Sequence, residues 1–158
     1  MAATWKVCQL KIDAVVLTYH VSLPAKSAPT TPAALLLALG GGSQEQVSSL
    51  AQRLGSTQPP QGWILVTALK PRGHKQFDRL LEPLCRHLLK TFKPSGGKVH
   101  LTGVSNGAVT ALQFALRSPA SCCSLSLVAI GNFDERWARM LPQLQGIPVR
   151  LFVGDLEL

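Results

Sequence analysis

The residues Gly103-Val104-Ser105-Asn106-Gly107 carry the clearest chemical signal in the sequence. They follow a strand-like run at 98–102 and precede a helix-like run at 108–117. A serine between two glycines at such a junction sits in a tight turn that strains its backbone and leaves room only for glycine on either side. The turn exposes the hydroxyl beside N–H groups that can hold an oxyanion. The pattern predicts either a purely structural turn or, as we favour, a nucleophile for acyl carbons at Ser105, with the N–H of Asn106 as an oxyanion donor.

Strand and helix patterns alternate along the chain, and this alternation predicts the sheet that positions Ser105. Alternating polar and apolar residues at 6–10 and 15–22 predict an antiparallel pair. The predicted later strands are 33–39, 63–68, 98–102, 124–130 and 149–153, and the predicted helices are 43–54, 75–92, 108–117 and 135–141. We therefore expect one α/β domain over residues 1–158, in which a mostly parallel, doubly wound sheet forms the middle of three α/β/α layers.

The loops at one edge of this predicted sheet are expected to form a binding site. Ligands of doubly wound sheets bind beyond the carboxyl ends of the strands. Five residues fall at or near those ends: Gly40, Lys70, Ser105, Gly131 and Gly154. The loop after 63–68 also carries Arg72 and Lys75, which are interpreted either as a solvated surface or as groups that select substrates with a carboxylate or phosphate.

Composition narrows the classes of partner. The net charge of +8 comes from lysines and arginines scattered along the chain, so we expect no nucleic-acid binding. The four cysteines lack metal-ligand spacing, and the adjacent Cys122 and Cys123 are interpreted as small buried thiols. The longest apolar run, 33–39, is too short to span a membrane, and no signal peptide is evident. These features predict a cytoplasmic protein without a metal site.

Taken together, the motifs resemble the α/β-hydrolase superfamily, in particular its small esterase, thioesterase and polyhydroxybutyrate-depolymerase-like branch. The resemblance runs from Leu17 to Glu157. In that branch a His-Gly-Gly-type turn follows the strand that 35–39 resembles, whereas here Leu39 precedes Gly40-Gly41-Gly42. Because the donor is a backbone group, the resemblance implies that the N–H of Gly41 or Gly42 joins that of Asn106 in an oxyanion hole. It also implies a small-molecule ester or thioester substrate, water as second substrate and no cofactor.

The same resemblance implies an acid that orients a catalytic histidine. Glu157 has the family's G-x-x-D spacing from Gly154, and Asp155 is its rival. The family order is serine, acid, histidine, yet every histidine of this chain precedes Ser105: His20, His74, His87 and His100. His87 and His100 are expected to be packed or solvated, and His74, in an edge loop, is a candidate substitute base.

We therefore expect a C-terminally truncated serine hydrolase of ester or thioester bonds that lacks the last strand and helix of its fold. Without the triad histidine its activity should be impaired, because a serine hydroxyl is a weak nucleophile at its free pKa. The alternative is a non-catalytic, hydrolase-like binding module. Truncation would also leave the strand at 149–153 as an exposed apolar edge and lower solubility.

Overall fold

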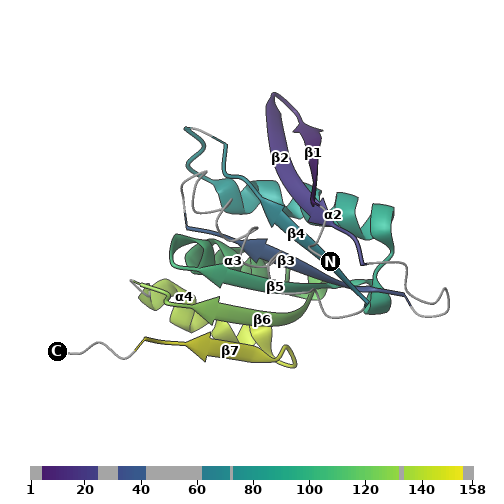
Figure 1. Cartoon of the computed structure of the whole chain (residues 1–158). Coiled ribbons are helices and arrows are strands. Elements are labelled where there is room, and N and C mark those ends of the chain that lie inside the picture. The colour runs from purple at the N-terminus through teal and green to yellow at the C-terminus, as the bar shows by residue number, and fades with distance from the viewer. Residues whose placement is uncertain (1–4, 25–31, 42–61, 72, 132–133, 155–158) are drawn as a thin grey trace.

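The computed structural model describes residues 5–24, 32–41, 62–71, 73–131 and 134–154. These residues form one seven-stranded sheet in the order β1-β2-β4-β3-β5-β6-β7, with helices packed behind it (Figure 1). The strands are β1 (Trp5–Ile12), β2 (Val15–Ser22), β3 (Ala34–Leu39), β4 (Trp63–Ala68), β5 (Val99–Val104), β6 (Cys122–Val128) and β7 (Val149–Phe152). The helices are α2 (Phe77–Phe92), α3 (Asn106–Arg117) and α4 (Glu135–Met140), with short 3₁₀ turns η1 (Ser95–Gly97), η2 (Pro119–Ser121) and η3 (Leu141–Leu144).

The N-terminal strands form the predicted antiparallel pair. β1 and β2 run in register from the Trp5–Ser22 pair to the Ile12–Val15 pair, and the tight turn between them includes Asp13 with φ 51°. β2 then pairs antiparallel with β4. Leu17, Tyr19 and Val21 are buried along one face of β2, as expected of a strand with a period of two.

All strands from β3 to β7 are parallel. Their carboxyl ends therefore meet at one edge of the sheet, which confirms the expected placement of the loops that follow them. This edge, where the sequence predicts the binding site, is called the active-site edge below. The predicted parallel, doubly wound class is confirmed, although the predicted helix at 43–54 lies outside the described residues.

Helix α2 buries the apolar face that its sequence predicts. The helix begins at Phe77, two positions later than expected, and Phe92 at its end is only half-buried. Its buried side chains are Phe77, Leu80, Leu81, Leu84, Cys85 and Leu88. An ion pair between Arg117 and Asp78 joins α3 to α2. The central helix α3 is almost enclosed, and Phe114 is its largest fully buried side chain.

The adjacent cysteines of β6 differ in exposure. Cys122 is buried as expected, but Cys123 is exposed, because successive residues of a strand point to opposite faces. The expected apolar edge strand is confirmed, since all four residues of β7 are exposed. No helix among the described residues is long and apolar enough to cross a membrane.

Candidate active site

Ser105 forms a one-residue turn between β5 and α3. Its backbone has φ 54° and ψ −123°, a combination that is strained for any residue with a Cβ. The residue is exposed at the active-site edge. The strained, accessible turn predicted around this serine is therefore confirmed.

Hydrogen bonds fix the backbone of Ser105 on both sides. Its N–H donates to the carbonyl of Val128, at the end of β6, with an N···O distance of 2.9 Å. Its own carbonyl accepts from the N–H of Ala108 at 2.8 Å, in the first turn of α3. The turn is thus held by a neighbouring strand and by the helix that follows, which is the rigid support that a reacting group needs.

The two glycines that flank the turn are required by close backbone approach. A Cβ on Gly103 would lie 2.6 Å from the Cα of Ala108 and would meet the carbonyl of Gly107. A Cβ on Gly107 would lie 2.7 Å from the carbonyl oxygen of Gly40 and would meet that of Leu39. Side-chain carbons essentially never come this close to backbone atoms, so the expected restriction to glycine is confirmed at both positions.

The contact between Gly107 and the end of β3 brings two of the predicted oxyanion segments together. Gly41 follows Gly40 directly and is buried, while Gly42 lies outside the described residues. Asn106 is the first residue of α3, so its N–H has no acceptor within its own helix. The turn after β3 and the N-terminus of α3 therefore adjoin Ser105, in an arrangement that can stabilise negative charge.

The remaining predicted site residues lie at the same edge or outside the described residues. Lys75 is exposed in the loop between β4 and α2, whereas Arg72 is outside the description. Gly154 follows β7, whereas the two candidate acids, Asp155 and Glu157, lie outside the described residues. Their assignment stays a prediction from the sequence.

Two of the four histidines are engaged in packing, as expected. The Nδ1 atom of His100 lies 2.8 Å from the hydroxyl oxygen of Ser124, and its ring lies against Trp63 with centroids 4.8 Å apart. Burial lowers the pKa of His100. His87 Nε2 lies 3.1 Å from the Tyr19 hydroxyl oxygen. These contacts confirm that both rings have structural partners.

His74, the candidate substitute base, is half-buried in the loop before α2. Its Nδ1 atom is buried and has no hydrogen-bond partner within the part of the chain that the structure describes. In the same described ranges, no group of three histidine, cysteine, aspartate or glutamate side chains could hold a metal ion.

Sequence reasoning missed one residue that supports the turn. Ala129, directly after β6, has φ 49°, and its N–H donates to the carbonyl of Phe152 at 2.8 Å. Together with the bond from Ser105 to Val128, this contact links β5, β6 and β7 at the active-site edge. Alanine rarely adopts a positive φ, so its type gave no signal of this position.

Comparisons with known proteins find similarity in structure alone. No protein-family model and no curated protein sequence matches the chain. A thermostable esterase superimposes with a TM-score of 0.73 at 14% identity, over 93% of this chain and 45% of its own. The esterase of Pyrobaculum calidifontis gives 0.63 at 14% identity, over 92% of this chain and 52% of its own. A cold-adapted esterase from an Arctic intertidal metagenomic library gives a TM-score of 0.61 at 18% identity, over 96% of this chain and 70% of its own.

The chain thus spans about half the length of the first two esterases. At these identities the similarity establishes a shared fold, and the chemistry has to be argued from the site.

Proposed function

Because the chain has the α/β-hydrolase fold, we propose that it is a serine hydrolase of carboxylic ester or thioester bonds. The observation that carries this proposal is the backbone of Ser105, an exposed non-glycine residue with φ 54° at the end of a central strand. Such strain costs on the order of 1–3 kcal/mol and is concentrated at functional sites. The esterases that share the fold support the choice of bond.

In the proposed reaction, the hydroxyl oxygen of Ser105 attacks the acyl carbon and its proton passes to a base. The acyl oxygen becomes negatively charged and accepts hydrogen bonds from two N–H groups, that of Asn106 and that of either Gly41 or Gly42. When this tetrahedral intermediate collapses, the base returns the proton to the leaving alcohol or thiol. An acyl-serine remains, which water hydrolyses in a second step. A single oxyanion donor of this kind contributes roughly 10²–10³ in rate. Glu157, or Asp155, would orient the base.

The 158-residue chain has no histidine at the position in the sequence where the resemblance would place the base. No histidine follows Ser105, and His87 and His100 already have structural partners. We therefore propose slow turnover, because an enzyme that lacks one triad member still accelerates the reaction by only roughly 10³–10⁴-fold over water. His74 is the candidate substitute base, and water is the other acceptor for the proton.

The basic loop after β4 supports a preference for anionic acyl substrates. Lys75 is exposed at the active-site edge, and Arg72 lies nearby in the sequence. A substrate with a carboxylate or phosphate near the scissile bond would be attracted by the positive charges of Lys75 and Arg72. Replacing both residues by alanine should lower the rate ratio between anionic and neutral p-nitrophenyl esters. An unchanged ratio would exclude this preference.

A fluorophosphonate probe tests the proposed nucleophile and separates it from the alternative. The probe forms a covalent bond with the hydroxyl of an activated serine and releases fluoride. Labelling of Ser105, located by peptide mapping and absent in Ser105→Ala, would support the hydrolase. A folded protein that stays unlabelled would instead favour a non-catalytic binding module.

A further inference from the structure

Two neighbouring strands of the sheet end in the same unusual backbone conformation. Ser105, after β5, has φ 54°, and Ala129, after β6, has φ 49°. Among the described residues, two other non-glycine residues have a positive φ, and both stand where such angles are common. Asp13 lies in the tight turn between β1 and β2, and Lys93 ends α2. Ala129 lies in neither a hairpin turn nor a helix end, and strain of this kind is concentrated at functional sites.

Equivalent hydrogen bonds hold these two strained residues. The N–H of Ser105 donates to the carbonyl of Val128, the last residue of β6, at 2.9 Å. The N–H of Ala129 donates in the same way to the carbonyl of Phe152, the last residue of β7, at 2.8 Å. Val104 lies opposite Val128 in the parallel pairing of β5 with β6, so the next pair in register is Ser105 and Ala129. The turn at Ala129 therefore repeats the turn at Ser105 one strand further along the sheet.

This equivalence fixes the direction of the methyl group of Ala129. The direction of a Cβ atom relative to the preceding peptide depends on φ alone, because φ is the only free rotation between them. Ser105 and Ala129 leave adjacent parallel strands with nearly equal φ. Apart from a twist of about 20° between the strands, their Cβ atoms therefore point the same way, side by side at the strand spacing of about 4.8 Å.

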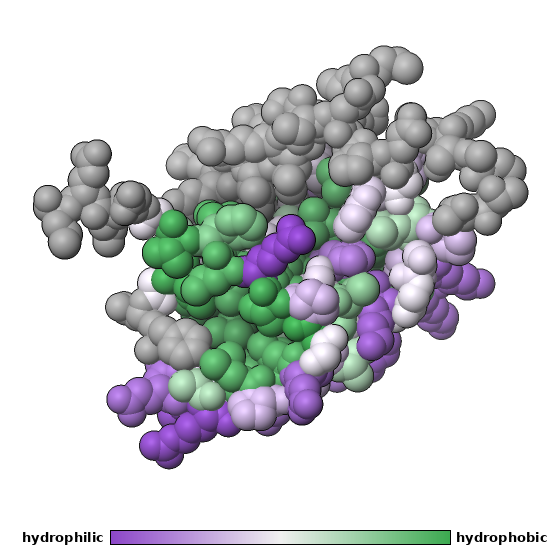
Figure 2. All heavy atoms as spheres, turned by 90° about the horizontal axis from the view of Figure 1, so that it is seen from below, coloured by the Kyte–Doolittle hydropathy of each residue, from purple (hydrophilic) through white to green (hydrophobic). Residues whose placement is uncertain are grey.

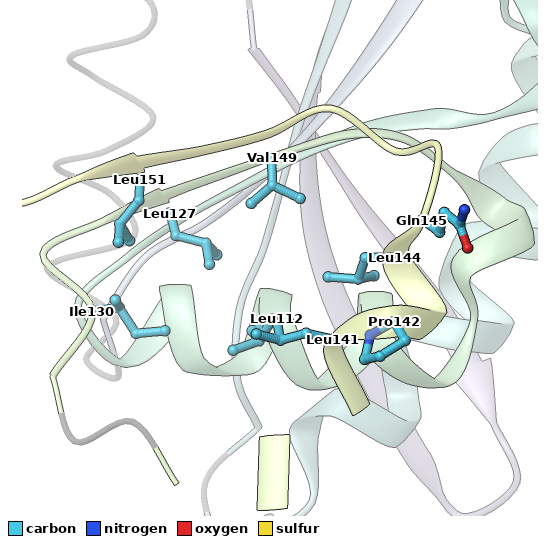
Figure 3. Close-up of a pocket in the computed structure, with 9 residues that line it drawn as sticks. All are labelled: Leu112, Leu127, Ile130, Leu141, Pro142, Leu144, Gln145, Val149 and Leu151. Carbon is cyan, nitrogen blue, oxygen red and sulfur yellow. The ribbon is translucent and has the colours of Figure 1, made fainter. Parts of the chain in front are cut away.

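The residues on either side of Ala129 belong to the apolar packing between the sheet and α3. Leu127 is buried and Ile130 is half-buried, and both line an apolar hollow between α3 and β7 (Figure 3). The described surface seen from below, on the β7 side, is likewise largely hydrophobic (Figure 2). Ala129 does not line the hollow and is exposed at the active-site edge. Its methyl group thus stands on a turn that is fixed by packing from one side and by hydrogen bonding to β7.

In the proposed reaction, on which the role of Ala129 rests, the acyl carbon bonded to Ser105 carries three other groups. The oxyanion lies on the side of β3, the strand next to β5 whose end leads to Gly41. The candidate base His74 follows β4, further along the same side, and the leaving group has to lie near the base that gives it a proton. The acyl chain is left with the β6 side, where Ala129 stands.

We propose that Ala129 is a specificity-determining residue, whose methyl group contacts the acyl chain and favours short acyl groups such as acetyl. Non-bonded carbon atoms approach one another to about 3.5–4.0 Å. At a spacing of about 4.8 Å from the Cβ of Ser105, a chain that extends over β6 meets the methyl group within its first few carbons. Glycine would adopt the backbone of Ala129 without strain, so the methyl group is what alanine adds at this position.

First-turnover acylation of the whole chain by p-nitrophenyl acetate, butyrate and hexanoate tests this role. The rate is followed by release of p-nitrophenolate, and peptide mapping locates the acyl group on Ser105. Ala129→Gly removes the methyl group and should raise the hexanoate-to-acetate rate ratio by roughly tenfold, the lower end for one carbon in a pocket. Ala129→Asn enlarges the side chain with a residue that accepts positive φ, and it should lower the ratio.

The matched control is Lys93→Gly, which relieves a similar φ of 45° at the end of α2. This helix leads to the amino end of β5, so Lys93 lies away from the active-site edge, and the ratio should stay at the wild-type value. Acylation of Ser105 with an unchanged ratio in Ala129→Gly would overturn the role of Ala129 and leave the proposed function standing. So would a change seen only when the leaving group is varied in a series of aryl acetates. A wild type in which no ester labels Ser105 would overturn the proposed function and the role of Ala129 together.

Discussion

The N–H of Ser105 and the carbonyl of Val128 are joined by a hydrogen bond with an N···O distance of 2.9 Å. This bond joins the last residue of β6 to the residue after β5 and so continues the pairing of the two strands into the turn. The adjacent Ala129 bonds in turn to Phe152 of β7. The proposed nucleophile is therefore anchored to the same backbone ladder that ends at the exposed edge strand.

The backbone strain at Ser105 should lower the free energy of unfolding by a measurable amount. Ser105→Gly is expected to raise the free energy of unfolding by about 1 kcal/mol, because glycine tolerates φ 54° and the relief exceeds its cost in unfolded-state entropy. Ser105→Ala keeps a Cβ and should gain nothing. Urea denaturation of the two variants compares them directly, and equal stabilities would show that the turn is not strained.

Gly107→Ala should damage both stability and the site. The added Cβ would collide with the carbonyls of Leu39 and Gly40, so β3 and α3 must separate. We expect a loss of about 2–3 kcal/mol in the free energy of unfolding, typical of overpacking. Thermal and urea unfolding would measure it.

The control for that change is Gly131→Ala, where a Cβ would meet no atom of the described residues within 4 Å. It should leave stability within about 0.5 kcal/mol of wild type. If Gly107→Ala were tolerated equally well, the close approach of β3 to the turn would be contradicted.

The cysteines should differ sharply in reactivity. Burial raises the pKa of Cys85 to about 12 and that of Cys122 to about 11, so neither is a thiolate near neutral pH. Cys123 is exposed. An aromatic disulfide reagent at mildly alkaline pH should therefore modify Cys123 in the native protein and reach Cys85 and Cys122 after unfolding. Peptide mapping assigns the sites, and fast native modification of Cys85 would contradict its burial.

Stability should fall in mild acid because of His100. Burial lowers the pKa of this ring below its ordinary value of 6.5, so the unfolded state takes up the proton first. The contribution of neutral His100 to the free energy of unfolding is fully present above pH 6.5. It is lost as the pH falls from 6.5 toward the lower pKa of the folded state. Urea denaturation at neutral pH and in mild acid measures the loss.

The comparison variant for this effect is His100→Gln, which cannot titrate in the same range. Its stability should decline less between the two pH values than that of the wild type. An identical decline in both proteins would assign the acid sensitivity to other groups.

Much of the fold could be predicted because local patterns agree with tertiary packing. The apolar run before Leu39 and the spacing of Leu80, Leu84 and Leu88 each point to a buried element, and the structure buries both. The sequence pattern does not define the element boundaries: β5 continues to Val104, and α3 begins at Asn106. The turn between them needs a single residue, so flanking patterns alone could not fix its limits.

The site could be predicted only in part. The glycines around Ser105 signal a close approach, but their sequence does not say that the carbonyls of Leu39 and Gly40 are the partners. Those contacts depend on β3 lying beside β5, which is a property of the strand order. The positive φ of Ala129 is equally hidden, because it accompanies a hydrogen bond to Phe152 that depends on the strand order.

Stoichiometric acylation by p-nitrophenyl acetate tests the central claim, that Ser105 is a nucleophile, most directly. The wild type should release p-nitrophenolate in a slow first turnover and acquire one acetyl group, which peptide mapping places on Ser105. Later turnovers should be slower still, and Ser105→Ala should acquire no acetyl group on the corresponding peptide. Equal p-nitrophenolate release by both proteins, with acetyl groups on lysines alone, would contradict the account.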